Sequence, residues 1–283
     1  MTAPQKILVT GGAGYIGSHV CKILAKSGFT PVVVDNLSTG FSWAVQWGEL
    51  AECDIRDGDK LSQIFEHHKP IAVLHFAAKI DAGESVENPD IYYNNNVVGA
   101  MSLLDVMRRH NVQNLVFSST CATYGVPESI PIDETHIQAP INPYGMSKLI
   151  AEHMIKDYGQ AFGSKFVALR YFNAAGADPE GEIGEAHDPE HHLIPLVLDV
   201  AAERLSQIQV FGTDYDTPDG TCIRDYIHVT DLAEAHVLAL NYLLDGGDSQ
   251  FLNLGNNQGF SVYEVIAAAR RITGRDISAV DAV

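Results

Sequence analysis

The chain has 283 residues, 46% of them hydrophobic, which is enough for a substantial core in one large domain or two closely packed ones. Its formal net charge of −18 excludes nucleic acid and anionic membrane surfaces as favoured partners, because the summed field repels phosphate. The cysteines are scattered without disulfide or metal-ligand spacing, and no apolar run approaches the ~18 residues of a membrane span. We expect a cytoplasmic protein with no membrane partner and no metal, since no histidine pair has matched carboxylate spacing.

A glycine-rich turn follows the first predicted strand, Lys6–Thr10, and precedes a helix that starts near Tyr15. In such a strand–turn–helix unit, Gly11 permits the tight turn, Gly14 lets a phosphate approach the helix N-terminus, and Gly17 lets helix and strand pack. The pattern predicts a dinucleotide-binding site, although glycine turns of this kind also occur in ordinary loops.

An acidic residue ends the second predicted strand. Asp35 follows the apolar run Pro31–Val34, close to the ~20 residues beyond the glycines that dinucleotide-binding folds require. A carboxylate at this position accepts hydrogen bonds from the adenosine ribose hydroxyls and repels a 2′-phosphate. We therefore expect the cofactor to be NAD rather than NADP.

Strand and helix patterns alternate through the first half of the chain, which predicts an α/β fold with a doubly wound parallel (Rossmann) sheet. Further strands are expected at residues 49–53, 72–76, 114–118 and 165–170, and helices at residues 60–68, 89–110 and 143–162. Parallel strands place their carboxyl ends on one edge of the sheet. The crevice at that edge should be lined by Thr10, Asp35, Asp54, Phe76 and Ser118.

Tyr144 and Lys148 are four residues apart on the predicted helix 143–162, so their side chains share one helix face. An ammonium beside a phenol, with a positively charged nicotinamide nearby, favours the phenolate, which can then accept a hydroxyl proton. Thr120, after the strand that ends near Ser118, can bridge a substrate oxygen and Tyr144. Alone, each pattern has a plain structural explanation, a half-buried tyrosine beside a surface lysine or a Ser/Thr turn.

The sequence changes character at Gly176, where acidic, loop-rich segments interrupt the alternation. We expect a NAD-binding domain over residues 1–175 and a smaller α/β substrate domain over residues 176–283. The segment 227–245 should return to pack on the first domain. Near the end of the chain, a helix is expected at residues 262–272 and a strand at residues 277–280.

These motifs resemble the extended short-chain dehydrogenase/reductase family and, within it, the sugar-nucleotide 4-epimerases. The matching segments are Val9–His19, Val34–Ser38, Phe76–Ala78, Gly83–Ser85, Phe117–Thr120, Tyr144–Lys148, Leu169–Asn173 and Asp219–Val229. The dinucleotide and Tyr/Lys motifs are common to the superfamily, whereas the last two segments are specific to the epimerase branch. The resemblance extends over nearly the whole chain.

The resemblance assigns roles to individual residues. The catalytic residues would be Thr120, Tyr144 and Lys148. The NAD-binding residues would be Gly11, Gly14, Tyr15, Ile16, Gly17, Asp35, Asn36, Asp54, Ile55, Phe76, Ala77, Ala78, Lys79, Asn95, Ser118, Tyr144, Lys148 and Phe172. The substrate-binding residues would be Thr120, Tyr144, Asn173, His192, Leu193, Gln209, Phe211 and Arg224, with the guanidinium of Arg224 suited to a diphosphate.

The implied reaction interconverts UDP-glucose and UDP-galactose. Hydride leaves the sugar C4 for bound NAD, the 4-keto sugar rotates, and hydride returns to the opposite face. Two alternatives remain open: a 4-epimerase acting on another UDP-sugar (an N-acetylhexosamine or a pentose) and a non-catalytic NAD-binding protein. A 4,6-dehydratase is disfavoured, because Cys121 and the residues after it supply no carboxylate for eliminating water.

Several features depart from the family pattern or lie at its margin. Many members have Lys at the position of Ile80, whereas this chain has Lys79 one place earlier. Many members also have Asn at the position of His192, and this histidine either contacts the diphosphate or is a bystander in a loop. Helices 89–110 and 143–162 correspond to the family's dimer-forming pair, which implies a homodimer. The family continues past Val283 with an arginine-containing segment over the diphosphate, so a protein ending here is expected to keep NAD but bind UDP-sugar weakly.

Overall fold

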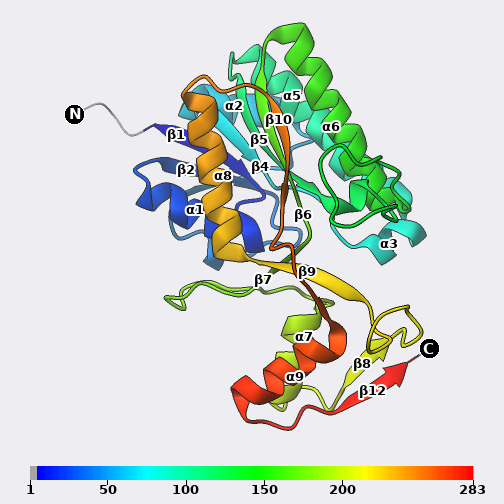
Figure 1. Ribbon diagram of the computed structural model, residues 1–283. Coiled ribbons are helices and arrows are strands. Elements are labelled where there is room, and N and C mark those ends of the chain that lie inside the picture. Colours follow the sequence, from blue (N-terminus) through cyan, green and yellow to red (C-terminus); the bar gives the residue numbers. More distant parts are fainter. Residues whose placement is uncertain (1–4, 283) are drawn as a thin grey trace.

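The computed structural model describes residues 5–282, which form a large lobe around a parallel sheet and a smaller lobe below it (Figure 1). The sheet has seven strands in the order β10-β6-β5-β4-β1-β2-β3, and every neighbouring pair is parallel. Its strands are β1 (Lys6–Thr10), β2 (Thr30–Asp35), β3 (Glu49–Glu52), β4 (Ala72–His75), β5 (Asn114–Thr120), β6 (Lys165–Tyr171) and β10 (Gln250–Leu254). The strand order reverses between β1 and β4, which is where doubly wound sheets bind their ligands.

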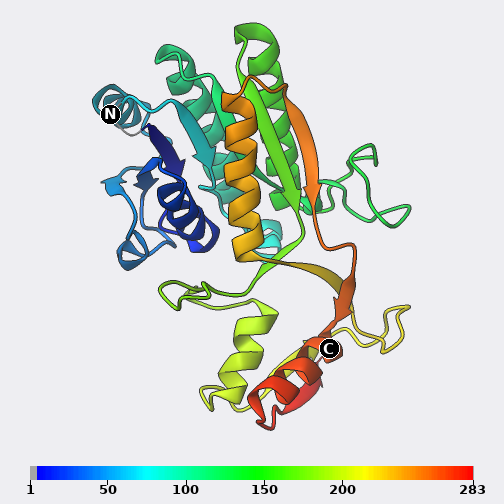
Figure 2. The same cartoon turned by 60° about the vertical axis from the view of Figure 1, so that its left-hand side comes forward.

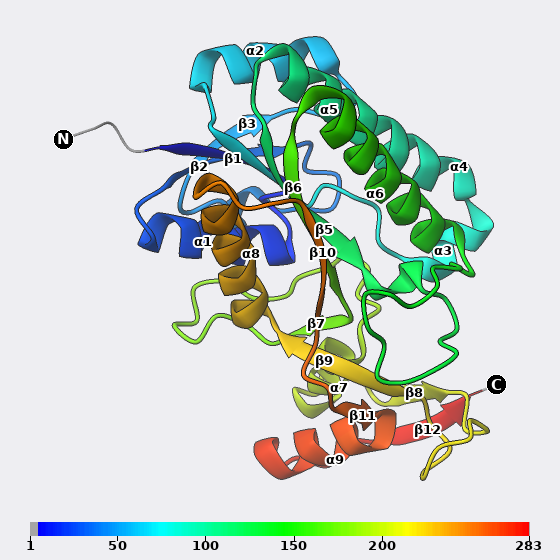
Figure 3. The same ribbon diagram turned by 45° about the horizontal axis from the view of Figure 1, so that its top comes forward.

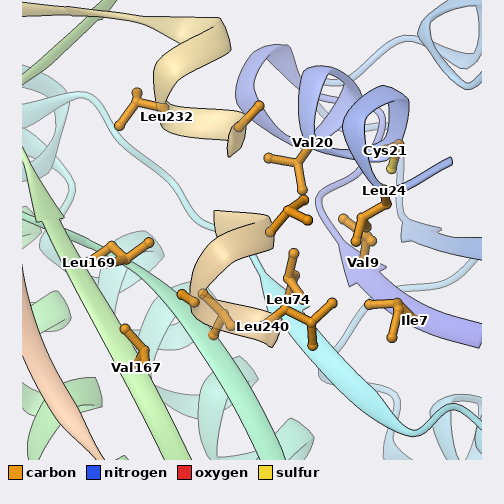
Figure 4. Packing of buried hydrophobic residues seen from close by; sticks show 14 of the residues in the cluster. Ile7, Val9, Val20, Cys21, Leu24, Leu74, Val167, Leu169, Leu232 and Leu240 are labelled. Carbon is orange, nitrogen blue, oxygen red and sulfur yellow. The ribbon is translucent and has the colours of Figure 1, made fainter. Parts of the chain in front are cut away.

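Helices cover both faces of the sheet (Figure 3). One face carries α1 (Tyr15–Lys26) and α8 (Val229–Leu244), and the other carries α2 (Gly58–His68), α5 (Gly99–Arg109) and α6 (Pro143–Phe162). Side chains of a strand point alternately to the two faces, so Ile7 and Val9 pack toward α1 and α8 whereas Leu8 packs toward α2 and α5. Figure 4 shows the first of these two cores, with Val20 and Leu24 of α1 near the sheet.

The smaller lobe is built mainly from the second half of the chain (Figure 2). It contains a sheet of β7 (Asn173–Ala175), β9 (Ile223–His228) and β11 (Gly259–Ser261), and a parallel pair of β8 (Ile208–Phe211) and β12 (Ala279–Ala282). Its own core lies between α7 (Leu193–Ala201) and α9 (Val262–Thr273) and includes Val197, Ile266 and Ile277. Within residues 5–282, no helix is long and apolar enough to cross a membrane.

The predicted elements of the sheet match the observed ones closely, and α6 has the predicted bounds. The single helix predicted at residues 89–110 is wrong in detail, because it is divided into α4 (Pro89–Tyr92), a π-helical turn (Tyr93–Val98) and α5. The short helix α3 (Ala82–Glu87), held at its start by the Asp81 side chain, was not predicted. Strand β10 was also missed, although it extends the large sheet beside β6.

His75 and His236 are buried in the large lobe, and burial lowers the pKa of His75 to about 3 and of His236 to about 4. Below pH ~6.5 the unfolded chain binds protons that the folded chain excludes, so stability should fall as the pH falls toward 4. We predict that His236→Leu reduces the dependence of the unfolding free energy on pH by up to about 1.4 kcal/mol per pH unit. Urea titrations at pH 7 and pH 5 measure it, with exposed His153→Leu as the control; an unchanged slope in His236→Leu contradicts the assignment.

Candidate active site

The glycine turn between β1 and α1 is shaped by close backbone contacts. Gly11 has a φ of +72°, and a Cβ on it would lie 2.6 Å from the backbone nitrogen of Ala77. A side chain on Gly17 would collide with the carbonyl oxygen of Gly11. Helix α1 begins after Gly14, and because glycine has no side chain, no side-chain group accepts a hydrogen bond from the first N–H groups of the helix. An uncapped helix start beside a glycine turn fits a pyrophosphate, and Tyr15 and Ile16 lie in its first turn.

Asp35 stands at the carboxyl end of β2, as predicted, and its carboxylate is tied to this turn. Its oxygens accept hydrogen bonds from the backbone N–H of Ala13 (3.0 Å) and of Leu37 (2.9 Å). The neighbouring Asn36 donates to Asp54 at 3.0 Å, and Asp54 also pairs with Arg56. Burial raises the pKa of Asp35, while these backbone donors lower it. Asp35, Asn36 and Asp54 therefore form one acidic edge of the crevice.

The loop after β4 passes over the opposite side of the turn. The backbone N–H groups of Phe76 and Ala77 both donate to the carbonyl oxygen of Thr10, at 2.9 and 3.1 Å. Farther along, the buried side chain of Asn96 accepts from the N–H of Lys79 (2.8 Å) and donates to its carbonyl oxygen (3.0 Å). These bonds fix the path of residues 76–79 across the crevice.

Asn96 was not predicted as a site residue. It lies in the π-helical turn, next to the predicted Asn95, and its amide also donates to Ser147 of α6 at 2.9 Å. The π-turn places this amide between the loop after β4 and α6, and such turns are frequent at functional sites. Three consecutive asparagines, which are weak helix formers, were the available signal in the sequence.

Helix α6 brings Tyr144 and Lys148 to the end of β5. The helix begins after Asn142, whose side chain accepts from the N–H of Gly145 at 2.8 Å. The Lys148 ammonium donates to the carbonyl oxygen of Ser118 at 2.9 Å and lies 5.0 Å from the ring centre of Phe117. The predicted Tyr/Lys pair thus lies beside the predicted Ser118.

Burial dominates the ionisation of this pair. It raises the pKa of Tyr144 to about 12, against the Thr120 hydroxyl, which lowers it. It lowers the pKa of Lys148 to about 7, against the carboxylate of Glu152. Of the side chains around Tyr144, the Thr120 hydroxyl lowers the pKa of the phenol and the Cys121 thiol raises it. Thr120 lies close to Tyr144, as predicted.

One turn beyond Lys148, the side chain of Glu152 anchors α6 to two strands. Its carboxylate accepts from the hydroxyl of Ser119 (2.5 Å) and from Nε and Nη2 of Arg170 (2.9 and 2.7 Å). The side chains of Glu152 and Arg170 are only 2% and 4% exposed, so neither charge can be satisfied by water. Arg170 also donates to the hydroxyl of Tyr124 at 2.9 Å and lies over the ring of Phe251. No local pattern in the sequence predicts this pair, because its two residues lie on different elements.

The predicted substrate residues are distributed over the smaller lobe. Asn173 of β7 donates to the carbonyl oxygen of Asp225 at 3.1 Å, next to Arg224 on β9. Burial raises the pKa of the Cys121 thiol after β5, and the nearby charge of Arg224 opposes this shift. These residues therefore approach the end of β5 that carries Thr120. In contrast, Gln209 and Phe211 lie on β8. Within residues 5–282, no hydrogen bond or ion pair joins them to Thr120, Tyr144 or Lys148.

Two further predicted residues lie where α7 begins. Leu193 is its first residue, and His192 precedes it as the N-cap. Nδ1 of His192 lies 2.8 Å from an oxygen of Glu190 and 3.1 Å from one of Glu185. Phe172, predicted to line the cofactor path, follows β6 and lies beside Gly255. Ile55 is buried against Gly99 of α5.

Comparisons with known proteins agree on one family. The family model described as the NAD dependent epimerase/dehydratase family matches residues 7–255. The UDP-glucose 4-epimerase of Rhizobium meliloti is 57% identical over 96% of this chain and 83% of its own length. A solved UDP-glucose 4-epimerase from Brucella ovis in complex with NAD has a TM-score of 0.96 at 56% identity, covering 98% of this chain and 85% of that chain. One from Bifidobacterium longum in complex with NAD+ and UDP has a TM-score of 0.92 at 38% identity, covering 98% and 86%.

The buried Glu152–Arg170 pair generates a stability prediction. Arg170→Met removes the guanidinium and leaves the Glu152 carboxylate buried without its counter-charge, which should lower the free energy of unfolding by about 3–5 kcal/mol. Adding Glu152→Gln to this variant should recover part of the loss. Lys165→Met, which breaks the exposed pair with Asp248, is the control and should have a much smaller effect. Equal losses in Arg170→Met and Lys165→Met, measured by urea denaturation, would contradict an anchoring role.

Proposed function

The chain belongs to the NAD-dependent epimerase/dehydratase family, and we propose that it interconverts UDP-glucose and UDP-galactose by inverting C4 of the sugar. The observation that carries the proposal is the convergence of Thr120, Tyr144 and Lys148 at the carboxyl end of β5, on the same edge of the parallel sheet as the glycine turn after β1. The identity to UDP-glucose 4-epimerases over nearly the whole chain supports this substrate pair over other UDP-sugars. A non-catalytic NAD-binding protein has no need of the three side chains together.

The crevice has the features that bound NAD requires. Gly11, Gly14 and Gly17 leave room for a pyrophosphate at the start of α1, and the Asp35 carboxylate is positioned for a ribose. Bound NAD supplies the acceptor and donor of hydride at the sugar C4. The side chains of the protein then have to bind the sugar nucleotide, orient C4 and move one proton at the C4 oxygen.

In the proposed reaction, Tyr144 takes up the proton of the C4 hydroxyl and later returns it, with Thr120 bridging the sugar oxygen and the phenol. A phenol with a pKa of about 12 holds its proton at neutral pH, so proton uptake needs added positive charge nearby. Lys148 is suited to respond, because its pKa of about 7 lets it gain or lose charge near neutrality. The substrate residues carried by the resemblance (Asn173, His192, Leu193, Gln209, Phe211 and Arg224) would hold the uridine diphosphate.

The side chain that follows Thr120 argues against elimination chemistry. Cys121 is a free thiol, and burial raises its pKa to about 11, so it is neutral at pH 7. A neutral thiol with a high pKa is a poor acid or base for removing water from a sugar. This supports a redox-neutral epimerisation over a 4,6-dehydration.

The remaining expectations are also part of the proposal. Residues 1–175 with the returning segment 227–245 would bind NAD, and residues 176–283 would bind the substrate. Exposed apolar side chains at Ile91, Val98 and Met101, all within residues 89–110, support a homodimer through this segment and α6. Four free cysteines are compatible with a cytoplasmic location.

Tyr144→Phe tests the proposed base. It removes the phenolic oxygen but none of the groups around the glycine turn, so NAD should stay bound while conversion of UDP-galactose to UDP-glucose falls roughly 10²–10⁴-fold. Thr120→Val should lose less, because it removes the bridge and leaves the phenol. Tyr158→Phe, on the same helix, is the control and should keep full turnover. Wild-type turnover in Tyr144→Phe, or a larger loss in Thr120→Val, would reverse these assignments.

Asp35→Ala tests the cofactor assignment. Losing a charged hydrogen-bond acceptor should weaken NAD binding roughly 10–100-fold and narrow the preference for NAD over NADP. Asp59→Ala, an exposed acidic residue on α2, is the control for the change in net charge. Mass spectrometry of the nucleotide released from the wild-type protein identifies the cofactor directly, and recovery of NADP would overturn the assignment.

A further inference from the structure

Four potential metal ligands converge in the loop that joins β7 to α7. They are Glu185, His187, Glu190 and His192, and one ligand atom from each lies within 4.8 Å of the other three. Nδ1 of His187 is 3.6 Å from Glu185 and 3.4 Å from Glu190, and Nδ1 of His192 is 3.1 and 2.8 Å from the same two carboxylates. Each imidazole nitrogen thus faces both carboxylates.

These separations match those within a small tetrahedral metal site. Zn²⁺ binds imidazole nitrogen and carboxylate oxygen at about 2.0–2.2 Å, so the ligand atoms of a tetrahedral site lie about 3.4 Å apart. The four imidazole-to-carboxylate distances, from 2.8 to 3.6 Å, lie around this value. Two imidazole nitrogens and two carboxylate oxygens suit Zn²⁺ and its first-row neighbours better than Mg²⁺ or Ca²⁺.

Glu185 and His187 are the members of the cluster without a hydrogen-bond partner among residues 5–282, whereas Glu190 also accepts from the backbone N–H groups of His191 and His192, at 2.9 Å each. The Glu185 side chain is only 8% exposed, and among residues 5–282 its carboxylate accepts no hydrogen bond; Nδ1 of His192 lies 3.1 Å from it. Nδ1 of His187 is buried without a hydrogen-bond partner in the same part of the chain. The carboxylates of Glu185 and Glu190 both approach the same two imidazole nitrogens, so the two acidic side chains lie close together. A divalent cation between them would satisfy all four side chains.

A neighbouring acidic group makes a useful contrast. Asp178, Glu180 and Glu182, earlier in the same segment, surround the ammonium of Lys22, which lies 2.6 to 2.7 Å from each. A side-chain cation from α1 thus already neutralises that group. No lysine or arginine is paired with Glu185 or Glu190 within the described residues. Of the two clusters, the one containing the histidines is therefore the one without a lysine or arginine cation among the described residues.

We propose that Glu185, His187, Glu190 and His192 bind one divalent first-row transition metal, of which Zn²⁺ is the best match. The sequence predicts no metal, because no histidine pair has the spacing from carboxylates that a metal site usually shows. In this loop, however, the curved backbone brings together four ligands that are separated by two, three and two positions in the sequence. The site lies against α1, because the rings of His187 and Tyr15 are 6.3 Å apart and Tyr15 donates to the carbonyl oxygen of Gly176. Metal binding would stiffen the segment that connects the two lobes.

The test measures metal binding to the NAD-loaded 283-residue protein rather than epimerisation, so its result is separate from that of the proposed function. After dialysis against a chelator, the protein is titrated with Zn²⁺ against a colorimetric competitor, and Co²⁺ is added to record the absorption bands of a tetrahedral site. We expect one tight equivalent of Zn²⁺ per chain. Glu185→Gln and His187→Gln should each weaken binding at least tenfold and abolish the tetrahedral Co²⁺ bands.

His191→Gln is the matched control, since His191 is adjacent to His192 but outside the cluster, and Glu182→Gln controls for the acidic group on Lys22. Both should bind Zn²⁺ like the wild type. Circular dichroism verifies that each variant is folded, and Glu190→Gln replaces any variant that is not. The proposal is overturned if the wild type binds no stoichiometric Zn²⁺, or if Glu185→Gln and His187→Gln bind it as tightly as His191→Gln does.

Discussion

The buried ion pair between Glu152 and Arg170 is the constraint on which the geometry of the active site depends. Glu152, Lys148 and Tyr144 lie at intervals of four residues along one face of α6, so fixing one fixes the others. Glu152 is held by Ser119 of β5 and Arg170 of β6, which brings Lys148 within 2.9 Å of the Ser118 carbonyl oxygen. Because a buried carboxylate must keep its partners, α6 cannot slide along the sheet without a large penalty. Catalytic placement and stability therefore rest on the same contacts.

The cofactor side of the crevice is positioned by the backbone instead. Gly11 and Gly17 allow β1, α1 and the loop after β4 to approach more closely than any side chain would permit. The side-chain amide of Asn96 then links that loop to Ser147 of α6, and so connects the cofactor side of the crevice to the helix that carries Tyr144 and Lys148. The crevice lies where the strand order reverses between β1 and β4, with the glycine turn on the β1 side and the loop after β4 and α6 on the other.

Features encoded in consecutive residues could be predicted, whereas features made by distant residues could not. The glycine turn, Asp35 after β2 and the bounds of α6 follow from local pattern and spacing. The Glu152–Arg170 pair joins a helix to a later strand, and the sequence of neither segment indicates which residue of the other it contacts. Strand β10 was missed because it is isolated in sequence from the alternating units. The π-turn around Asn96 and the convergence of Glu185 with His192 depend on local curvature that residue spacing does not reveal.

The central claim is that this crevice removes and returns the hydrogen at the sugar C4 without exchanging it with the surroundings. The most direct measurement uses UDP-galactose carrying deuterium at C4, with mass and NMR spectra taken of the UDP-glucose formed. The account predicts that the product retains deuterium at C4 and that no reduced cofactor accumulates, because the same hydrogen leaves and returns within one closed site. Loss of deuterium to solvent, or NADH rising in step with an oxidised sugar, would contradict it.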